Sequence, residues 1–176
     1  MVILEDQQEK KPLKFNMNWE CLDAVERIHL KTGDYMVRFN DGYVPPICIE
    51  RKSKADLYGT LTSGMRRFRN EVNRAIEAGY RFYLFIEESQ EDCNKPLMYR
   101  KCGKWHKKKT EPLSIMRTLN TLEVKHGVIH KFYNSPEAMA LAVYRLFYAS
   151  GKLYAENLRK LKRELKDSKK AKELLD

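Results

Sequence analysis

Two carboxylates and an amine are the groups in this 176-residue chain best suited to chemistry. Asp34 follows a glycine, and Glu50 stands sixteen residues later with Lys52 two positions beyond it. The run from Cys48 to Lys52 changes abruptly from apolar to ionic, which costs free energy at the edge of a core unless something binds there. Paired carboxylates with a cation beside them predict a divalent-metal site suited to phosphodiester cleavage.

A predicted hairpin must position these groups. Residues 35–39 and 44–49 have the apolar pattern of strands, and Asn40-Asp41-Gly42 between them is a hairpin turn signal. Asp34 and Glu50 then meet at the open end of the hairpin, because paired strands lie about 5 Å apart. Ionised carboxylates at that separation repel each other, so we expect one pKa to rise unless a cation lies between them.

Mg²⁺ suits this site because it prefers oxygen ligands and accepts a shell completed by water and substrate phosphate. We expect Mn²⁺ to substitute for it and no organic cofactor to be needed. The backbone carbonyl of Arg51 is a natural third ligand. Lys52 shares a strand face with Glu50, so its ammonium can hold the attacking water and offset charge on the phosphate. The competing interpretation is a solvated ion-pair cluster at a helix start, formed by Glu50, Arg51, Lys52 and Asp56.

Charge and composition indicate a polyanionic partner. The formal net charge is +10 and the pI about 9.4, with 34 Lys and Arg against 24 Asp and Glu, which favours nucleic acid over an acidic membrane surface. No apolar run reaches the roughly 18 residues of a membrane span. We expect no targeting segment. The four cysteines include no CxxC pair, so we expect reduced thiols in a cytoplasmic protein.

The rest of the pattern predicts a mixed α/β sheet with helices on its faces. Expected strands are 2–4, 35–39, 44–49, 81–87 and 128–132. Expected helices are 19–30, 54–78 with a break at Ser63-Gly64, 112–126, 136 to about 150, and a second one after Gly151. Residues 6–16 and 88–111 are expected to be loops.

The motif residues resemble a known family. Gly33-Asp34-Tyr35 followed by the stretch Ile49 to Leu57 resembles the GD…ERKxxxD motif of the XPF-family structure-specific nuclease domain, a member of the restriction-endonuclease-like PD-(D/E)xK superfamily. Weaker likenesses at residues 2–9, 84–87 and 128–142 extend the coverage to about residues 1–150. Gln8 departs from the pattern, because the family usually has arginine there.

The resemblance implies a restriction-endonuclease-like mixed central sheet flanked by helices, with a helical C-terminal extension. It divides the chain into a nuclease domain (1–150) with a basic loop insert (88–111), and a basic C-terminal helix (151–176). By resemblance, Asp34 and Glu50 hold the metal and Lys52 is the catalytic lysine. The supporting site residues are Asp6, Glu9, Arg51 and Asp56.

The implied activity is Mg²⁺-dependent endonucleolytic cleavage of branched or single-strand-containing DNA, such as a flap, fork or junction. Three alternatives stay open: a catalytically silent DNA-binding scaffold or partner subunit, a junction resolvase or exonuclease, and an RNA-directed nuclease. A homodimer is one option for assembly. The small size would suit a protein encoded by a phage or mobile element, and we expect a cytoplasmic, nucleoid-associated location.

Basic residues outside the motif are candidates for DNA contact. The insert interleaves lysines with aromatic side chains, which suits a backbone grip with base stacking, although a solvated insert explains the composition as well. Arg67 either faces DNA with its neighbours or pairs with Glu71 one turn away. The leucine stripe after Lys152 is typical of packing or self-association. The DNA-binding candidates are Arg66, Arg67, Arg69, Lys101, Lys104, Trp105, Lys107, Lys108 and Lys109.

Overall fold

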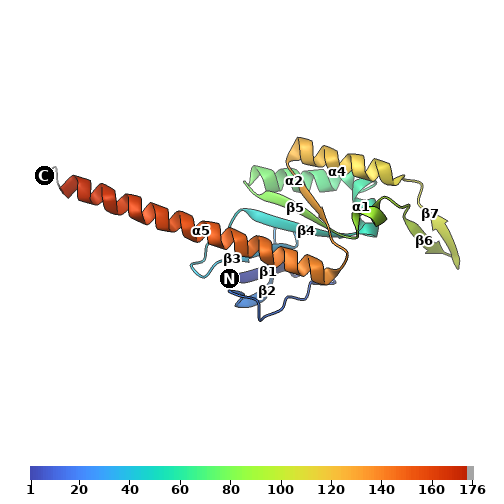
Figure 1. The fold of residues 1–176 in the computed structure, drawn as a ribbon. Coiled ribbons are helices and arrows are strands. Elements are labelled where there is room, and N and C mark those ends of the chain that lie inside the picture. The colour runs from blue at the N-terminus through green and yellow to red at the C-terminus, as the bar shows by residue number, and fades with distance from the viewer. Residues whose placement is uncertain (174–176) are drawn as a thin grey trace.

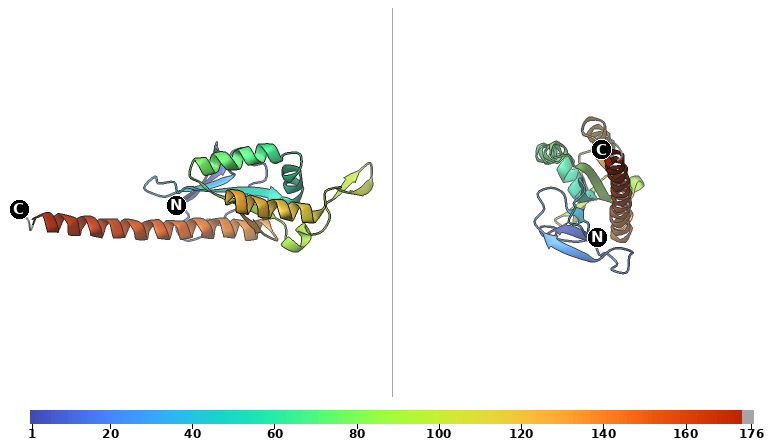
Figure 2. Two further views of the ribbon diagram at one scale, coloured as in Figure 1. Left: turned by 90° about the horizontal axis from the view of Figure 1, so that it is seen from above. Right: turned by 90° about the vertical axis from the view of Figure 1, so that its left-hand side faces the viewer.

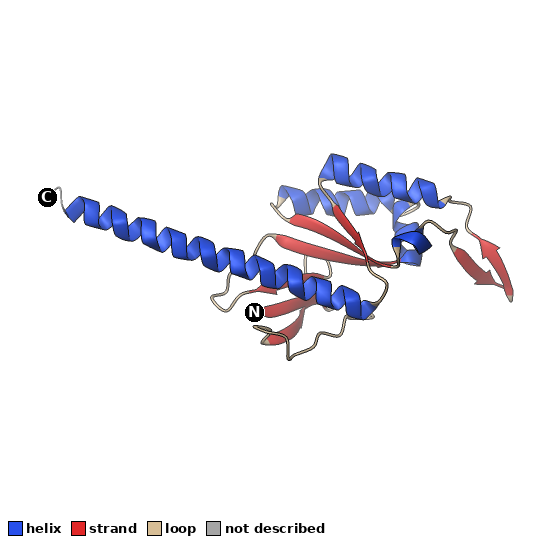
Figure 3. Cartoon of the chain, in the orientation of Figure 1, coloured by secondary structure: helices blue, strands red, loops and turns tan. Residues whose placement is uncertain are grey.

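A six-stranded mixed sheet forms the centre of the computed structural model, which describes the backbone of residues 1–173 and the side chains up to residue 166 (Figure 1). The strand order is β2-β1-β3-β4-β5-β8, and Figure 3 shows the strands in red beside the helices. The strands are β1 (Val2–Asp6), β2 (Ala24–Ile28), β3 (Tyr35–Arg38), β4 (Ile47–Ser53), β5 (Arg81–Glu87) and β8 (Ile129–Phe132). Only β3 runs antiparallel to the other strands of this sheet in the described residues.

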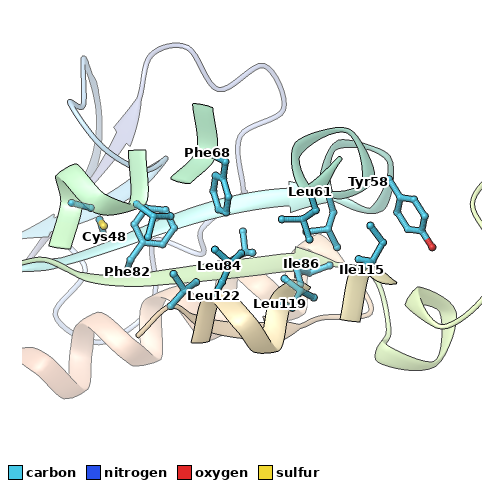
Figure 4. Close-up of a cluster of buried hydrophobic side chains, with 14 of the residues drawn as sticks. Cys48, Tyr58, Leu61, Phe68, Phe82, Leu84, Ile86, Ile115, Leu119 and Leu122 are labelled. Atoms are coloured by element: carbon cyan, nitrogen blue, oxygen red, sulfur yellow. The ribbon is translucent and has the colours of Figure 1, made fainter. Parts of the chain in front are cut away.

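Helices cover both faces of the sheet (Figure 2). They are α1 (Lys54–Leu61), α2 (Met65–Glu77), α3 (Gln90–Cys93), α4 (Pro112–His126) and α5 (Pro136–Glu173). One core lies between the sheet and the helices α1, α2 and α4, where Phe68, Leu84 and Leu119 are buried (Figure 4). A second core lies between the opposite face and α5, where Phe85 and Phe147 are buried. Alternate residues of β4 and β5 serve the two cores because strand side chains alternate between faces.

The helix predicted for residues 19–30 is wrong, because β2 occupies the second half of that segment. β2 pairs in parallel with β1, from Val2 opposite Ala24 to Asp6 opposite Ile28. Cys21 just before it has a positive φ of 59°, a conformation that no right-handed helix contains. Trp19 still packs inward, with its ring 4.7 Å from that of Tyr144 on α5.

The predicted loop 88–111 is also more structured than expected. It contains the short helix α3 and a separate two-stranded hairpin, β6 (Met98–Lys101) and β7 (Lys104–Lys107). The other predicted strands are present, although β4 begins only at Ile47, because the preceding Pro45-Pro46 cannot donate ladder hydrogen bonds. The helix break at Ser63-Gly64 separates α1 from α2 as predicted.

The C-terminal helix does not break at Gly151, contrary to the sequence interpretation. α5 is continuous from Pro136 to Glu173. A methyl group at Gly151 would lie 3.2 Å from Cε1 of Phe39, so this glycine admits the Phe39 ring rather than ending the helix. None of the described helices is long and apolar enough to span a membrane.

Candidate active site

Three predicted site residues, Asp6, Asp34 and Glu50, gather with Glu87, which was not predicted, at one edge of the sheet, where the parallel strands end. Asp6 ends β1, Glu87 ends β5, and Glu50 lies three residues before the end of β4. Asp34 directly precedes β3, and since β3 is antiparallel its beginning reaches the same edge. A cleft of about 710 Å³ opens there and is lined by all four residues. Ligands of α/β sheets characteristically bind at the carboxyl ends of the strands.

Asp34 is held by the backbone on both sides. Its N–H donates to the Ile49 carbonyl at 2.7 Å, and its carbonyl accepts from the Asp6 N–H at 2.8 Å. Its carboxylate oxygen Oδ2 accepts from the Arg51 N–H at 2.7 Å. Gly33 makes this approach feasible, because its φ is +70° and a Cβ there would lie 3.0 Å from the Ile49 carbonyl oxygen.

Glu50 and Lys52 lie on the same face of β4 and form a direct ion pair. Cys48 on that face belongs to the core under α1 and α2, so the pair points toward these helices. The Glu50 residue is only 5% exposed. A charged group this deep is tolerated because it is paired.

The pKa values of the site residues shift in the direction expected for buried carboxylates that lie near each other. Burial, with a contribution from the Glu50 charge, raises the pKa of Asp34 to about 7. Burial also raises the pKa of Glu50. For Lys52, burial acts to lower the pKa, but the nearby Glu50 and Asp34 carboxylates outweigh it and the pKa is raised. Lys52 is therefore a permanent cation at neutral pH.

The donor set at this edge fits a hard divalent cation. Asp34 and Glu50 supply carboxylate oxygens in a buried setting that favours a neutralising charge. The Arg51 N–H points toward Asp34, and because the N–H and C=O of a strand residue point to the same side, the Arg51 carbonyl lies along the same edge. No group of three His, Cys, Asp or Glu side chains suited to a metal occurs among the described residues, so the predicted set depends on this carbonyl, water and substrate.

Arg51 directs its side chain to the opposite face of the sheet. Its guanidinium pairs with Glu87, lies 3.5 Å from the Glu9 carboxylate, and donates to the Lys11 carbonyl at 2.5 Å. Its Nε is buried without a hydrogen-bond partner. The Arg51 side chain therefore contacts two carboxylates that line the cleft. The contact ties the segment containing Glu9 to the ends of β4 and β5.

The supporting carboxylates have local partners. Asp6 accepts a hydrogen bond from the Leu30 N–H at 3.3 Å. Ser53 caps α1, with its Oγ accepting from the Asp56 N–H at 3.2 Å and donating to the Asp56 carboxylate at 2.6 Å. The Ser53 side chain is thus the N-cap of α1 and is itself bonded to the Asp56 carboxylate. Asp56 lines the cleft at this helix start, and its supporting role in the site stays a prediction.

Comparison with known proteins identifies the family. The family model described as the ERCC4 domain matches residues 6–146. The chain belongs to the ERCC4 domain family. No curated protein sequence matches it.

Two solved structures share the fold of this ERCC4 domain. XPF from Aeropyrum pernix is 19% identical with a TM-score of 0.61, and the match covers 89% of this chain and 68% of that chain. XPF from Aeropyrum pernix in complex with DNA is 20% identical with a TM-score of 0.60, covering 86% and 65%. The predicted XPF resemblance and the predicted mixed sheet with flanking helices are both confirmed.

Helix α2 adds Glu71 and Arg74, which the sequence interpretation missed as site residues, to the cleft of the ERCC4 domain beside the predicted DNA contact Arg67. The Glu71 carboxylate contributes to the raised pKa of both Glu50 and Lys52. The spacing of four and three residues from Arg67 to Glu71 to Arg74, which places them on one helical face, was the available signal. Arg66 and Arg69, predicted as DNA contacts with Arg67, are not part of the cleft lining. The Arg67–Glu71 ion pair is absent from the described contacts within 4 Å.

The remaining predicted DNA contacts lie outside the cleft. All residues of β6 and β7 are exposed, and the hairpin projects beyond the end of the sheet (Figure 2). The candidates here and in the following segment are Lys101, Lys104, Trp105, Lys107, Lys108 and Lys109, and none of them lines the cleft. Two separate surfaces therefore carry the predicted site residues.

Proposed function

We propose that this ERCC4 domain is a Mg²⁺-dependent endonuclease that hydrolyses phosphodiester bonds in branched or single-strand-containing DNA. The observation that carries the proposal is that Asp34, Glu50 and Lys52 line one cleft at the carboxyl edge of the sheet, with Lys52 paired to Glu50. Buried ionic groups with raised pKa values in a cleft are typical of catalytic sites. Membership of the ERCC4 family supports the assignment, as does the similarity to an XPF that forms a complex with DNA.

Asp34, Glu50 and the Arg51 carbonyl would hold the metal. Bound there, Mg²⁺ would stabilise negative charge on the scissile phosphate. Without a cation, the raised pKa of Asp34 means that this carboxyl group exchanges its proton near neutral pH, far above the range of an ordinary aspartate. The protein thus keeps a partly neutral acid that becomes a ligand when a cation displaces the proton.

Lys52 contributes by position and charge. Its pairing with Glu50 fixes the ammonium at the cleft and keeps it protonated. A charged ammonium donates hydrogen bonds but cannot accept a proton, so Lys52 orients the attacking water and offsets charge on the phosphate rather than acting as a base. Water forms the new P–O bond in line with the breaking bond to the 3′ oxygen. The expected products carry a 5′-phosphate and a 3′-hydroxyl.

Cleavage of labelled DNA tests the proposal. Flap, fork, four-way junction, duplex and single-stranded substrates are incubated with Mg²⁺ or Mn²⁺, using wild type, Asp34→Ala, Lys52→Ala and the control Lys125→Ala at an exposed position of α4. We expect only wild type and the control to cut, with a preference for branched or partly single-stranded DNA. If wild type binds forks but cuts nothing, the chain is a silent scaffold. If Asp34→Ala and Lys52→Ala retain full activity, the site assignment is wrong.

Assembly, location and domain division stay predictions. A homodimer is testable by light scattering of the full chain. The proposed association with the nucleoid follows from the proposed DNA substrate and is testable by fluorescence microscopy of a tagged chain. A phage or mobile-element origin and the boundary at residue 150 rest on the sequence interpretation.

A further inference from the structure

The hairpin β6–β7 is a small element that stands off the body of the protein. Its strands pair from Met98 opposite Lys107 to Lys101 opposite Lys104. The two turn residues, Cys102 and Gly103, have φ values of +49° and +76°, as a type I′ hairpin turn requires. All eight strand residues are exposed. Isolated two-stranded hairpins are marginally stable in water, so this one is expected to gain order from a partner.

The two faces of the hairpin are chemically different. On one face the Tyr99 ring stacks on His106 at 5.5 Å, and the Lys108 ammonium lies 5.5 Å from the same ring. On the other face Trp105 lies opposite Arg100. Trp105 is 67% exposed and has no aromatic neighbour among the described ring contacts. The Tyr99 ring is therefore already engaged within the protein, whereas the Trp105 ring is free.

The charge around the hairpin selects the kind of partner. No acidic residue occurs from Lys95 to Thr110, while the same stretch carries the basic residues Lys95, Arg100, Lys101, Lys104, Lys107, Lys108 and Lys109. Lys95 and Lys107 have carboxylate partners, but these pairs are exposed and such pairs contribute little. An exposed indole surrounded by uncompensated cations matches a polyanion that also offers flat apolar rings.

We propose that the Trp105 face is a stacking platform for an unpaired strand of the substrate, with Arg100 and Lys107 contacting its phosphates. This inference rests on the proposed function for the identity of the polyanion as DNA. Single-strand binding characteristically combines aromatic stacking with a basic track, whereas the bases of a duplex are already stacked on each other and cannot cover an indole. The Trp105 face therefore discriminates unpaired from paired DNA.

The position of the hairpin joins it to the cleft. It follows the carboxyl end of β5, where Glu87 lines the cleft, and it projects from that end of the sheet, opposite the free end of α5 (Figure 1). A strand held on Trp105 thus leaves the cleft at the edge where the scissile phosphate is proposed to bind. DNA with a duplex-to-single-strand branch can occupy both surfaces together.

Tryptophan fluorescence tests this inference without requiring cleavage. The chain has two tryptophans, so Trp19→Phe leaves Trp105 as the reporter. Oligothymidylate without divalent metal should quench this emission, and a blunt duplex of equal charge should not. Trp105→Ala should weaken binding of the oligothymidylate by about 10- to 100-fold, whereas Tyr99→Phe should leave it within about twofold. If Trp19→Phe does not fold, the difference in emission between wild type and Trp105→Phe isolates the Trp105 signal, and its quenching by each DNA is measured instead.

The outcomes separate this inference from the proposed function. Equal quenching by duplex, absence of quenching, or unchanged affinity of Trp105→Ala would overturn the inference. If forks are cleaved and Trp105→Ala cuts them as wild type does, the nuclease assignment survives and the platform does not. If no DNA is cleaved but oligothymidylate still quenches Trp105, the platform survives and the nuclease assignment fails.

Discussion

The cleft and the hairpin β6–β7 carry charge in opposite physical settings. In the cleft the Asp34 carboxylate accepts a hydrogen bond from the Arg51 backbone N–H, and Glu50 is buried in an ion pair with Lys52. On the hairpin Arg100 and Trp105 are exposed on a two-stranded element outside the main sheet. The cleft groups are thus fixed before any ligand arrives, which is the arrangement that catalysis requires.

The difference predicts where the free energy of each region resides. Charges in the cleft interact strongly because little water separates them, and they cost stability when unpaired. Charges on the hairpin are screened by solvent and salt, so they influence association with a polyanion but hardly affect folding. Substitutions in the two regions should therefore change different observables.

Removing the ammonium of the cleft should give the largest effect. Lys52→Met keeps the length and apolar stem of the side chain but removes the charge that is paired with Glu50. We expect the single-turnover cleavage rate to fall by about 10²- to 10³-fold. Lys131→Met on the edge strand β8 is the control. A rate within tenfold of wild type would show that Lys52 has no role in the reaction.

Neutralising Asp34 should stabilise the metal-free protein at alkaline pH. Its pKa of about 7 lies above its ordinary 3.8, so the folded state binds more protons than the unfolded state and stability falls as pH rises from 4 to 7. The maximal loss is about 4 kcal/mol. Asp34→Asn removes this loss, so its advantage over wild type in urea unfolding with EDTA should grow by about 2–4 kcal/mol from pH 4 to pH 8.

Asp41 supplies a matched control, because its pKa is shifted in the opposite direction to that of Asp34. The pKa of Asp41 is lowered, chiefly by a hydrogen bond from the Tyr154 hydroxyl. Asp41→Asn should therefore lose stability relative to wild type only as pH rises through the acid range around and below 3.8, and its difference from wild type should stay nearly constant between about pH 5 and pH 8. Mg²⁺ should raise the melting temperature of wild type at pH 8 and leave that of Asp34→Asn nearly unchanged. A pH-independent difference between wild type and Asp34→Asn would contradict the buried-acid description of the cleft.

Gly33 should cost more to replace than a glycine of similar φ elsewhere. Gly33 and Gly127 have φ values of +70° and +66°, but a Cβ meets the Ile49 carbonyl only at Gly33. Alanine should cost about 1–2 kcal/mol at Gly127 from backbone strain alone, and at least about 1 kcal/mol more at Gly33. Chemical denaturation measures both. Equal costs would mean that the close packing beside Asp34 contributes nothing.

Local signals explain why much of the cleft was predictable. The turn Asn40-Asp41-Gly42 and the apolar runs beside it predict the close approach of Asp34 to Glu50 from nearby residues. β2 was missed because its pairing with β1 is non-local, while Trp19, Leu22 and Val25 imitate helical spacing. Tertiary pairing overrides such a short pattern.

Glu71 was missed for a similar reason, since it reaches the cleft only through the packing of α2 on the sheet. The hairpin β6–β7 escaped prediction because its strands are exposed on both faces, so no apolar alternation marks them. Its turn is built on Cys102-Gly103 rather than on the Asn-Gly or Asp-Gly pairs that announce a type I′ turn. Residues whose roles depend on distant packing leave the weakest trace in sequence.

Removing two basic side chains of the Trp105 face should change the salt dependence of binding rather than the stability. Arg100 and Lys107 are the residues proposed to contact phosphates, and both are exposed. If each neutralises one phosphate of a single strand, their double alanine variant should lower the slope of log affinity against log salt by about 1.4. Titrations of oligothymidylate across a salt series measure the slope. An unchanged slope would exclude these two residues from the DNA contact.

The two tryptophans give the sharpest contrast in stability, with the smallest expected effect at Trp105. Trp105 is 67% exposed on the hairpin, so Trp105→Ala should leave the free energy of unfolding within about 0.5 kcal/mol. Trp19 packs against Tyr144 and Phe15 in the second core, so Trp19→Ala should cost about 2–4 kcal/mol. Urea unfolding of both variants measures the two changes in the free energy of unfolding. A comparable loss for Trp105→Ala would mean that its ring is engaged by the fold itself and is not available to DNA.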